Sequence, residues 1–336
     1  MRKVSLGATG LMVTKTSFGA LPIQRVSFDE AARLLRCAYD AGINFFDTAN
    51  FYTDSEEKIG YALSDVRDKI IIATKSSMGS IAEIRANLEL SLSHMKTDYI
   101  DIFQLHNPKT LPSDEIYEYL LSEKRAGRIR HIGFTNHRID LAREAVLSGR
   151  FETLQFPFCL LSGERERELV RLTDEHDMGF IAMKAISGGL LTDSRAVFAF
   201  LDMFPSVVPI YGVQRMEELK QWIALENDPP VMDDALRRVI EDARTELSGD
   251  FCRGCGYCMP CSVGITISEA ARMSLLIKRA PSERFFSDEW RANMALIDKC
   301  TGCGRCAAKC PYGLDTPQLL KRELARYRAL CLERDS

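Results

Sequence analysis

Residues 69–107 read KIIIATKSSMGSIAEIRANLELSLSHMKTDYIDIFQLHN, and this stretch decides the fold. Two short apolar runs, KIIIATK and IDIFQLH, flank a longer segment whose apolar residues have helical spacing. Short apolar runs of this kind favour buried strands, and a helix between two of them is typical of a parallel βαβ unit. The stretch therefore predicts a parallel sheet covered by helices.

The same alternation continues in both directions along the chain and gives eight strand–helix pairs. Strands are expected at residues 14–20, 43–49, 69–75, 100–106, 131–136, 153–159, 179–185 and 207–213. Helices are expected at residues 28–42, 55–66, 81–96, 112–127, 140–149, 164–177, 194–204 and 216–225. Eight such units over roughly 220 residues predict an α/β fold of the closed (β/α)8 TIM barrel type. A doubly wound open sheet is the alternative, but no G-x-G-x-x-G motif follows the first strand.

The composition excludes several classes of protein. The chain has 336 residues, of which 46% are hydrophobic and 27% charged, and its formal net charge is −3. This charge gives no reason to expect a nucleic-acid or membrane-surface partner. Glycines and polar residues interrupt the N-terminal segment, so we expect no signal peptide, and no apolar run reaches the roughly 18 residues that a membrane span needs. With most cysteines clustered rather than dispersed, we expect a cytoplasmic protein.

Polar side chains follow the predicted strands at their C-terminal ends. Asp47, Lys75 and His106 end the second, third and fourth strands, and Tyr52 lies in the loop after the second. Asn136 ends the fifth strand, Gln155 lies in the sixth, and Arg215 follows the eighth. Because active sites of (β/α)8 barrels lie at the C-terminal ends of the strands, we expect these side chains to line one mouth of the barrel.

The first four side chains form a proton-donating set. A tyrosine has an ordinary pKa of about 10, which is too high for efficient proton donation near neutral pH. The ammonium group of Lys75 would lower the pKa of Tyr52 by stabilising its phenolate, and Asp47 would hold that ammonium charged. A neutral His106 could bind the substrate oxygen or the phenol. Tyr52 is therefore predicted to act as a general acid toward a carbonyl group.

Residues 1 to about 225 resemble an aldo-keto reductase. The similar segments are FFDTANFYTDSEEKIGYAL, ATKS, DYIDIFQLHNP, GRIRHIGFTNH, the GGLL after the seventh strand, and PIYGVQRMEEL. The resemblance implies an NADPH-dependent oxidoreductase that reduces an aldehyde or ketone by hydride transfer. It places the catalytic roles of that family on Asp47, Tyr52, Lys75 and His106, and it implies that Glu56 supports the loop.

The resemblance also implies a cofactor that lies extended across the barrel mouth. Met183 stands where the family often stacks an aromatic ring on the nicotinamide, and Arg215 suits a 2′-phosphate because its planar fork matches that anion. This favours NADP(H), with NAD(H) as the alternative. The implied cofactor contacts are Thr135, Asn136, Gln155, Met183, Lys184, Gly212, Arg215 and Glu218.

The last third of the chain is a separate module. Residues 226–250 are expected to form a linker and a bridging helix after a barrel at 1–225. Two cysteine tetrads follow within residues 251–336, at Cys252, Cys255, Cys258 and Cys261 and at Cys300, Cys303, Cys306 and Cys310. The second tetrad, C-x2-C-x2-C-x3-C-P, matches the run of two-cluster bacterial ferredoxins, whereas the first lacks the longer last gap and the proline.

We predict a helical ferredoxin-like domain with two [4Fe–4S] clusters, and zinc held by four thiolates is the alternative. The resemblance to ferredoxins implies an exchanged pattern of ligands. Cys310 would complete the cluster of the first three cysteines, and Cys261 would complete the cluster of Cys300, Cys303 and Cys306. Cys37, Cys159 and Cys331 fall outside both motifs and are expected to be ordinary thiols.

Two classes of function fit these features. The first is an NADPH-dependent carbonyl reductase that acts on a small molecule and has structural or accessory clusters. The second is an electron-transfer protein whose clusters exchange single electrons with a redox partner protein. Nicotinamide transfers two electrons as hydride, whereas a cubane cluster transfers one, and the sequence has no recognisable flavin signature. The complete set of four catalytic side chains favours the first class, and it argues against a barrel that only binds nucleotide.

Overall fold

The computed structural model describes residues 1–247, 249, 251–279 and 282–335. Contacts within the chain form two compact units. The first comprises Met1–Ala185 and Ser194–Arg237, and the second comprises Ile186–Asp193 and the chain from Arg238 onward. The division after Arg237 lies within the segment 226–250 that the sequence predicts as a linker and bridging helix, and positions 248 and 250 of that segment lie outside the described residues.

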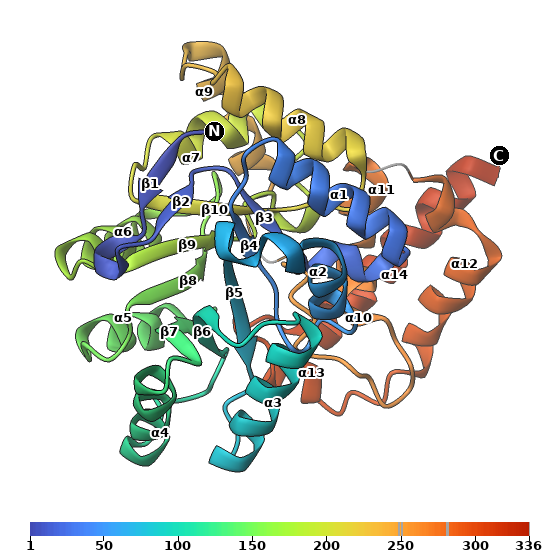
Figure 1. Cartoon of the computed structure of the whole chain (residues 1–336). Helices are drawn as coiled ribbons and strands as arrows, with labels where there is room; N and C mark the ends of the chain where they lie inside the picture. Colours follow the sequence, from blue (N-terminus) through green and yellow to red (C-terminus); the bar gives the residue numbers. More distant parts are fainter. Residues whose placement is uncertain (248, 250, 280–281, 336) are drawn as a thin grey trace. The chain divides into compact units, whose positions relative to one another are not determined.

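The first unit is a closed barrel of eight parallel strands, so the predicted fold class is confirmed (Figure 1). Around the barrel the strand order is β10-β3-β4-β5-β6-β7-β8-β9. The strands are β3 (Ser17–Gly19), β4 (Phe45–Asp47), β5 (Ile71–Ser76), β6 (Ile100–His106), β7 (Ile129–Thr135), β8 (Thr153–Pro157), β9 (Gly179–Met183) and β10 (Val207–Gly212). Each strand pairs with the next in sequence, and β10 closes the ring against β3.

Helices follow the strands in the predicted alternation. They are α1 (Phe28–Asp40), α2 (Ser55–Leu63), α3 (Ile81–His94), α4 (Asp114–Arg125), α5 (Ile139–Leu147), α6 (Glu164–Glu175), α7 (Ser194–Asp202) and α8 (Met216–Asn227). The local sequence determines where several of these helices begin. Ser27 and Glu30 form a capping box at α1, and Ser80 and Glu83 form one at α3. Such boxes satisfy two backbone donors that the first helical turn leaves unpaired.

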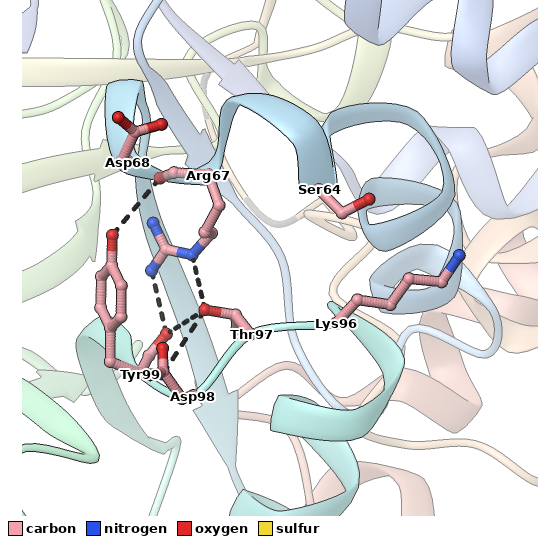
Figure 2. A pocket seen from close by; sticks show the side chains of 7 residues that line it. All are labelled: Ser64, Arg67, Asp68, Lys96, Thr97, Asp98 and Tyr99. Carbon is pink, nitrogen blue, oxygen red and sulfur yellow. Dashed lines mark hydrogen bonds between the residues drawn. The ribbon is translucent and has the colours of Figure 1, made fainter.

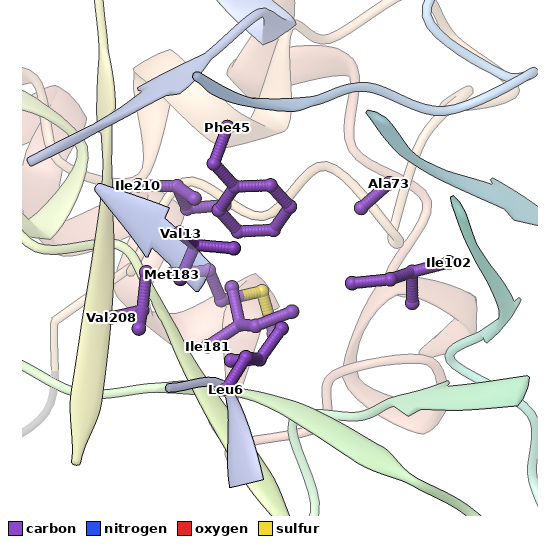
Figure 3. Close-up of a cluster of buried hydrophobic side chains, with 9 residues drawn as sticks. All are labelled: Leu6, Val13, Phe45, Ala73, Ile102, Ile181, Met183, Val208 and Ile210. Carbon is purple, nitrogen blue, oxygen red and sulfur yellow. The ribbon is translucent and has the colours of Figure 1, made fainter. Parts of the chain in front are cut away.

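An N-terminal hairpin contributes to the barrel core. Strands β1 (Lys3–Ser5) and β2 (Met12–Thr14) pair antiparallel and are joined by a short 3-10 helix, Gly7–Thr9. Figure 3 shows Leu6 and Val13 of this hairpin packed with side chains from the barrel strands, namely Phe45, Ala73, Ile102, Ile181, Met183, Val208 and Ile210. The hairpin lies at the N-terminal ends of the strands, since Ala8 N–H donates to the carbonyl of Asp177, just before β9.

An open hollow lies at the same N-terminal end, away from the expected active site. Figure 2 shows its lining residues, which precede β5 and β6 in sequence. Its one large buried cation, Arg67, is held by Asp101 at 2.7 Å and by the carbonyls of Ile70 and Tyr99 at 3.0 Å each. These contacts join loop and strand backbone, so Arg67 has a structural role.

The described residues of the second unit form helices joined by loops, and the cysteines of the first tetrad lie in a loop. The helices after the barrel are α9 (Asp234–Glu246), α10 (Ile267–Ala270), α11 (Met273–Arg279), α12 (Asp288–Ala295), α13 (Arg305–Ala308) and α14 (Thr316–Asp335). The long helix α14 buries Glu323, whose carboxylate accepts the backbone N–H of Ser274 at 2.8 Å, and Tyr327, whose hydroxyl donates to the carbonyl of Phe285 at 2.7 Å. None of the helices in the described ranges is long and apolar enough to cross a membrane.

The hairpin provides a test of the packing. Gly7 and Gly10 both have positive φ, at +55° and +74°, but a Cβ on Gly7 would lie 2.3 Å from Gly179 N, whereas a Cβ on Gly10 would have no atom within 4 Å. Gly10→Ala should lower the free energy of unfolding by about 1 kcal/mol through backbone strain alone. Gly7→Ala should lower it by roughly 2–5 kcal/mol, because the overlap adds to that strain. Urea unfolding measures both values, and equal losses would contradict this packing.

Candidate active site and cysteine clusters

Three of the four predicted catalytic residues lie on adjacent barrel strands. Asp47 ends β4, Lys75 lies one residue before the end of β5, and His106 ends β6. The parallel register pairs Lys75 with Gln104, two residues before His106. All three side chains therefore lie at the C-terminal end of the barrel, where the fold predicts an active site.

Asp47 and Lys75 form a buried ion pair. Lys75 Nζ donates to both carboxylate oxygens of Asp47, at 2.7 and 2.8 Å, and to the carbonyl of Thr48. Both side chains are almost completely buried. Burial raises the pKa of Asp47 and lowers the pKa of Lys75, and the attraction between their charges opposes both shifts. Loss of either partner would leave the other charge buried and unpaired, so the two residues act as a unit.

Tyr52 and His106 lie beside this pair. Lys75 Nζ is 5.4 Å from the centroid of the Tyr52 ring. The Tyr52 and His106 rings meet edge to face, with centroids 6.0 Å apart. Burial, reinforced by the charge of Lys75, lowers the pKa of His106 to about 3. The imidazole is therefore neutral near pH 7, and the structure brings all four predicted catalytic side chains together.

Gln104 belongs to the same network and was not among the predicted site residues. Its Nε2 donates to Gln155 Oε1 at 2.8 Å and lies 3.4 Å from Asp47 Oδ2. Gln155 Nε2 in turn donates to Asp47 at 3.3 Å, and Thr135 Oγ1 donates to Gln104 Oε1 at 2.8 Å. The signal was available in the sequence, because Gln104 precedes His106 by two residues and so faces the same side of the strand.

Glu56 holds the loop that carries Tyr52. Its carboxylate accepts hydrogen bonds from Thr74 Oγ1, from Ser91 Oγ at 2.7 Å and from Asn50 Nδ2 at 3.3 Å. Burial raises its pKa, and these hydrogen bonds oppose the shift. The three donors come from β5, from α3 and from the loop itself, so Glu56 joins that loop to the barrel wall.

The predicted contacts for the nicotinamide lie at the ends of β7 and β9. Asn136 is buried, donates to the carbonyl of Pro108 at 2.9 Å, and accepts the backbone N–H groups of His137 and Arg138 at 3.0 and 2.8 Å. Met183 ends β9 inside the hydrophobic cluster of Figure 3, and Lys184 follows it with a positive φ of +61°. Asn136 thus orders the turn into α5, while Met183 contributes to the core.

The predicted contacts for the adenosine end follow β10. Gly212 ends that strand, and Arg215 precedes α8. Arg215 Nε donates to Glu218 Oε1 at 2.9 Å, and the other carboxylate oxygen accepts the backbone N–H of Arg215 at 3.2 Å. More than half of the Arg215 side chain remains exposed. The guanidinium is therefore oriented by Glu218 and accessible to an anion.

Four cysteines line one cavity in the C-terminal unit. They are Cys252, Cys255, Cys258 and Cys310, and the rest of the lining includes Ile267, Pro311, Leu314 and Leu319. The backbone N–H of Gly254 donates to Cys252 Sγ at 3.4 Å. Burial raises the pKa of Cys258 to about 12, and the neighbouring thiols add to the shift. This grouping combines three cysteines of the first tetrad with the last cysteine of the second.

The remaining predicted ligands are Cys261, Cys300, Cys303 and Cys306. Cys303 is exposed, and a hydrogen bond from Arg305 lowers the pKa of its thiol to about 7. Burial raises the pKa of Cys306, with smaller contributions from Cys300 and Cys303. Within the described part of the chain, no three His, Cys, Asp or Glu side chains are close enough to hold a single metal ion.

Comparison with known proteins gives two family matches. Residues 8–197, more than half of the chain, match the aldo/keto reductase family, and residues 251–315 match a 4Fe-4S dicluster domain. The chain belongs to the aldo/keto reductase family. The prediction of an oxidoreductase with a C-terminal 4Fe–4S domain is therefore confirmed.

The individual relatives each match only part of this aldo/keto reductase. It is 32% identical over 208 residues to an uncharacterized oxidoreductase, YqkF, of Bacillus subtilis, covering 57% of this chain and 67% of that protein. It is 28% identical over 251 residues to a 6-dehydroglucose reductase of Novosphingobium aromaticivorans, covering 65% and 80%. A solved putative aldo-keto reductase from Pseudomonas aeruginosa has a TM-score of 0.61 at 28% identity, covering 67% and 93%. One from Klebsiella pneumoniae, in complex with NADPH, has a TM-score of 0.64 at 21% identity, covering 73% and 96%, which supports the fold.

The neutral state of His106 can be tested directly. Because its folded pKa of about 3 lies below the ordinary value of about 6.5, the folded protein binds fewer protons than the unfolded chain between these values. Stability should therefore fall as the pH drops from 6.5 toward 4, and His106→Gln should reduce this fall. In NMR spectra of histidine-labelled protein, the signal that His106→Gln removes should not titrate between pH 5 and 8. A midpoint near pH 6.5 for that signal would contradict the assigned environment.

Proposed function

We propose that this aldo/keto reductase reduces the carbonyl group of a small aldehyde or ketone with NADPH, and that Tyr52 is the general acid. The observation that carries this proposal is the position of Lys75, whose ammonium is bound by Asp47 and lies beside the Tyr52 ring. A cation held there stabilises the phenolate that remains when Tyr52 gives up its proton.

Each residue of the set then has a distinct task. Tyr52 holds the proton that the carbonyl oxygen receives, and Lys75 offsets the negative charge that remains on the phenolate. Asp47 holds the ammonium in place and is itself oriented by Gln104 and Gln155. His106 is neutral, so its ring can bind the substrate oxygen without adding a second positive charge next to Lys75. Charges shielded from water, such as those of the Asp47–Lys75 pair, interact with nearby groups more strongly than they would in solvent.

The residues at the mouth are suited to a nicotinamide dinucleotide. When bound, NADPH supplies the hydride. Arg215 presents a guanidinium that Glu218 orients and solvent reaches, which suits a 2′-phosphate. A solved aldo-keto reductase of similar fold, from Klebsiella pneumoniae, has been crystallised with NADPH. Thr135, Asn136, Gln155, Met183, Lys184 and Gly212 are proposed to complete the cofactor site.

We also propose that the dicluster domain holds two [4Fe–4S] clusters. Four thiols that line one largely apolar cavity supply the ligand set that a [4Fe–4S] cluster would need. That cavity would hold the first cluster on Cys252, Cys255, Cys258 and Cys310. Cys261, Cys300, Cys303 and Cys306 would hold the second.

A role in electron transfer is the second candidate function. It is favoured by the exposure of Cys303, because a cluster near the surface can exchange single electrons with a redox partner protein. In the first candidate function, NADPH reduces a carbonyl substrate by hydride transfer. In the second, the clusters exchange single electrons with a partner, so the two differ in whether NADPH alone reduces the carbonyl or the clusters. The two candidates are therefore separable by experiment.

Tyr52→Phe tests the proposed general acid. The variant should lower the turnover number for p-nitrobenzaldehyde by roughly 10²–10⁴-fold, because it removes the transferred proton but keeps the ring. NADPH binding, measured by fluorescence titration, should change little. Tyr61→Phe, at an exposed position on α2, is the matched control and should keep full activity. A Tyr52→Phe enzyme with near-normal turnover would rule out this role for Tyr52.

Arg215→Ala tests the choice of cofactor. Loss of a charged hydrogen bond should weaken NADPH binding by roughly 1.5–3 kcal/mol, while NADH binding changes little. Arg171→Ala is a suitable control, because Arg171 is also exposed and pairs with a nearby carboxylate, that of Glu164. Equal losses of affinity for the two cofactors would show that Arg215 does not bind the 2′-phosphate.

A further inference from the structure

The segment Ile186–Asp193 is unusual in its contacts. It follows β9 and precedes α7, and both of these belong to the barrel unit. Its own contacts nevertheless group it with the C-terminal unit, which carries the cysteines. This loop thus lies between two barrel elements in the sequence but packs with the C-terminal unit.

Arg272 makes a specific contact to this loop. Its Nη1 donates to the carbonyl of Gly188 at 3.0 Å, and its Nε donates to the carbonyl of Ser268, also at 3.0 Å. The residue is only 8% exposed. One buried guanidinium therefore joins the loop to the start of α10 by two hydrogen bonds from one rigid plane.

Two glycines leave the space that this guanidinium occupies. A Cβ on Gly254 would lie 2.6 Å from Arg272 Cζ, and a Cβ on Gly188 would lie 2.7 Å from Arg272 Nη1. Both glycines have positive φ, at +63° and +67°. The backbone on each side of Arg272 is therefore shaped to receive it.

Arg272 and its hydrogen-bond partner Ser268 lie next to Cys252 of the first cysteine tetrad. Cys252 Sγ lies 3.8 Å from the carbonyl of Ser268, which is also the acceptor for Arg272 Nε. The backbone N–H of Gly254, the residue packed on the guanidinium, donates to Cys252 Sγ. The positive charge of Arg272 is therefore close to a cysteine that we assign to the first cluster.

We propose that Arg272 is a positioning residue that couples the first cluster to the loop Ile186–Asp193. Its charge stabilises the reduced cluster, and its planar fork holds the loop in place. This inference rests on the proposed assignment of the first cluster, but not on the carbonyl chemistry.

The two parts of the proposal depend on different properties of the side chain. Net charge and hydrogen bonds near a cluster set its reduction potential. Holding the loop needs two donors in one plane, which arginine supplies and lysine does not. Lysine at position 272 should therefore keep the potential but release the loop, whereas glutamine should change both.

The experiment uses anaerobically purified, cluster-loaded full chain. A redox titration followed by electron paramagnetic resonance should show one of the two clusters shifted to a more negative midpoint in Arg272→Gln. In Arg272→Lys that midpoint should stay near the wild-type value. Arg284→Gln, which removes another arginine of the same unit, stacked on Phe285, is the control and should shift neither cluster.

Hydrogen–deuterium exchange on the same samples follows the loop. Peptides from residues 186–193 should exchange faster in both Arg272 variants, and also in wild-type protein after its iron has been removed. Gly188→Ala and Gly189→Ala form a pair that retains Arg272. Both positions have positive φ, but only a Cβ on Gly188 meets the guanidinium, whereas one on Gly189 has no atom within 4 Å. Only Gly188→Ala should shift the cluster midpoint.

The failures are distinguishable. Wild-type protein that binds no iron–sulfur cluster under these conditions would overturn the cluster assignment together with this inference. Two intact clusters with the same midpoints in wild type, Arg272→Gln and Gly188→Ala would overturn the coupling alone. If Arg272→Gln does not assemble, the Gly188 and Gly189 pair decides the question.

Discussion

The ion pair between Asp47 and Lys75 is the interaction on which the rest of the active site depends. Two opposite charges are taken out of water at the end of adjacent strands, at a cost in solvation that only close pairing offsets. Gln104, Gln155 and the carbonyl of Thr48 satisfy the remaining hydrogen-bonding groups. The barrel supplies the rigid frame that this pair needs, and the pair places a cation beside the Tyr52 ring.

The sequence was sufficient to predict the architecture, because the same alternation of a short apolar run and an amphipathic segment repeats along the barrel part of the chain. Apolar runs such as Ile100–His106 are too short for helices, and the segments between them are amphipathic and capped, as Ser80 and Glu83 are at α3. The fold alone places a residue that ends such a run at the C-terminal end of the barrel. Asp47, Lys75 and His106 can therefore be grouped from the sequence alone, although they are far apart in the chain.

Other features needed side-chain geometry. Nothing in the local sequence says that Gln104 of β6 bonds Gln155 of β8 across the intervening strand β7, or that Glu218 pairs with part of the Arg215 guanidinium. Least predictable was the grouping of Ile186–Asp193 with the C-terminal unit, where the carbonyl of Gly188 accepts a hydrogen bond from Arg272, more than eighty residues later in the chain. Spacing rules identify ligands within a motif, but they do not say which distant loop packs on it.

We propose that the barrel performs hydride transfer and that the clusters take no electrons directly from NADPH, because a cubane transfers single electrons and the sequence has no recognisable flavin signature that could couple the two. The most direct measurement is an anaerobic stopped-flow single turnover of cluster-loaded protein with p-nitrobenzaldehyde and NADPH deuterated at C4, following nicotinamide and cluster absorbance together. The account predicts a primary isotope effect on NADPH oxidation with unchanged cluster absorbance. Cluster bleaching at the rate of NADPH oxidation, in the absence of the aldehyde, would contradict it.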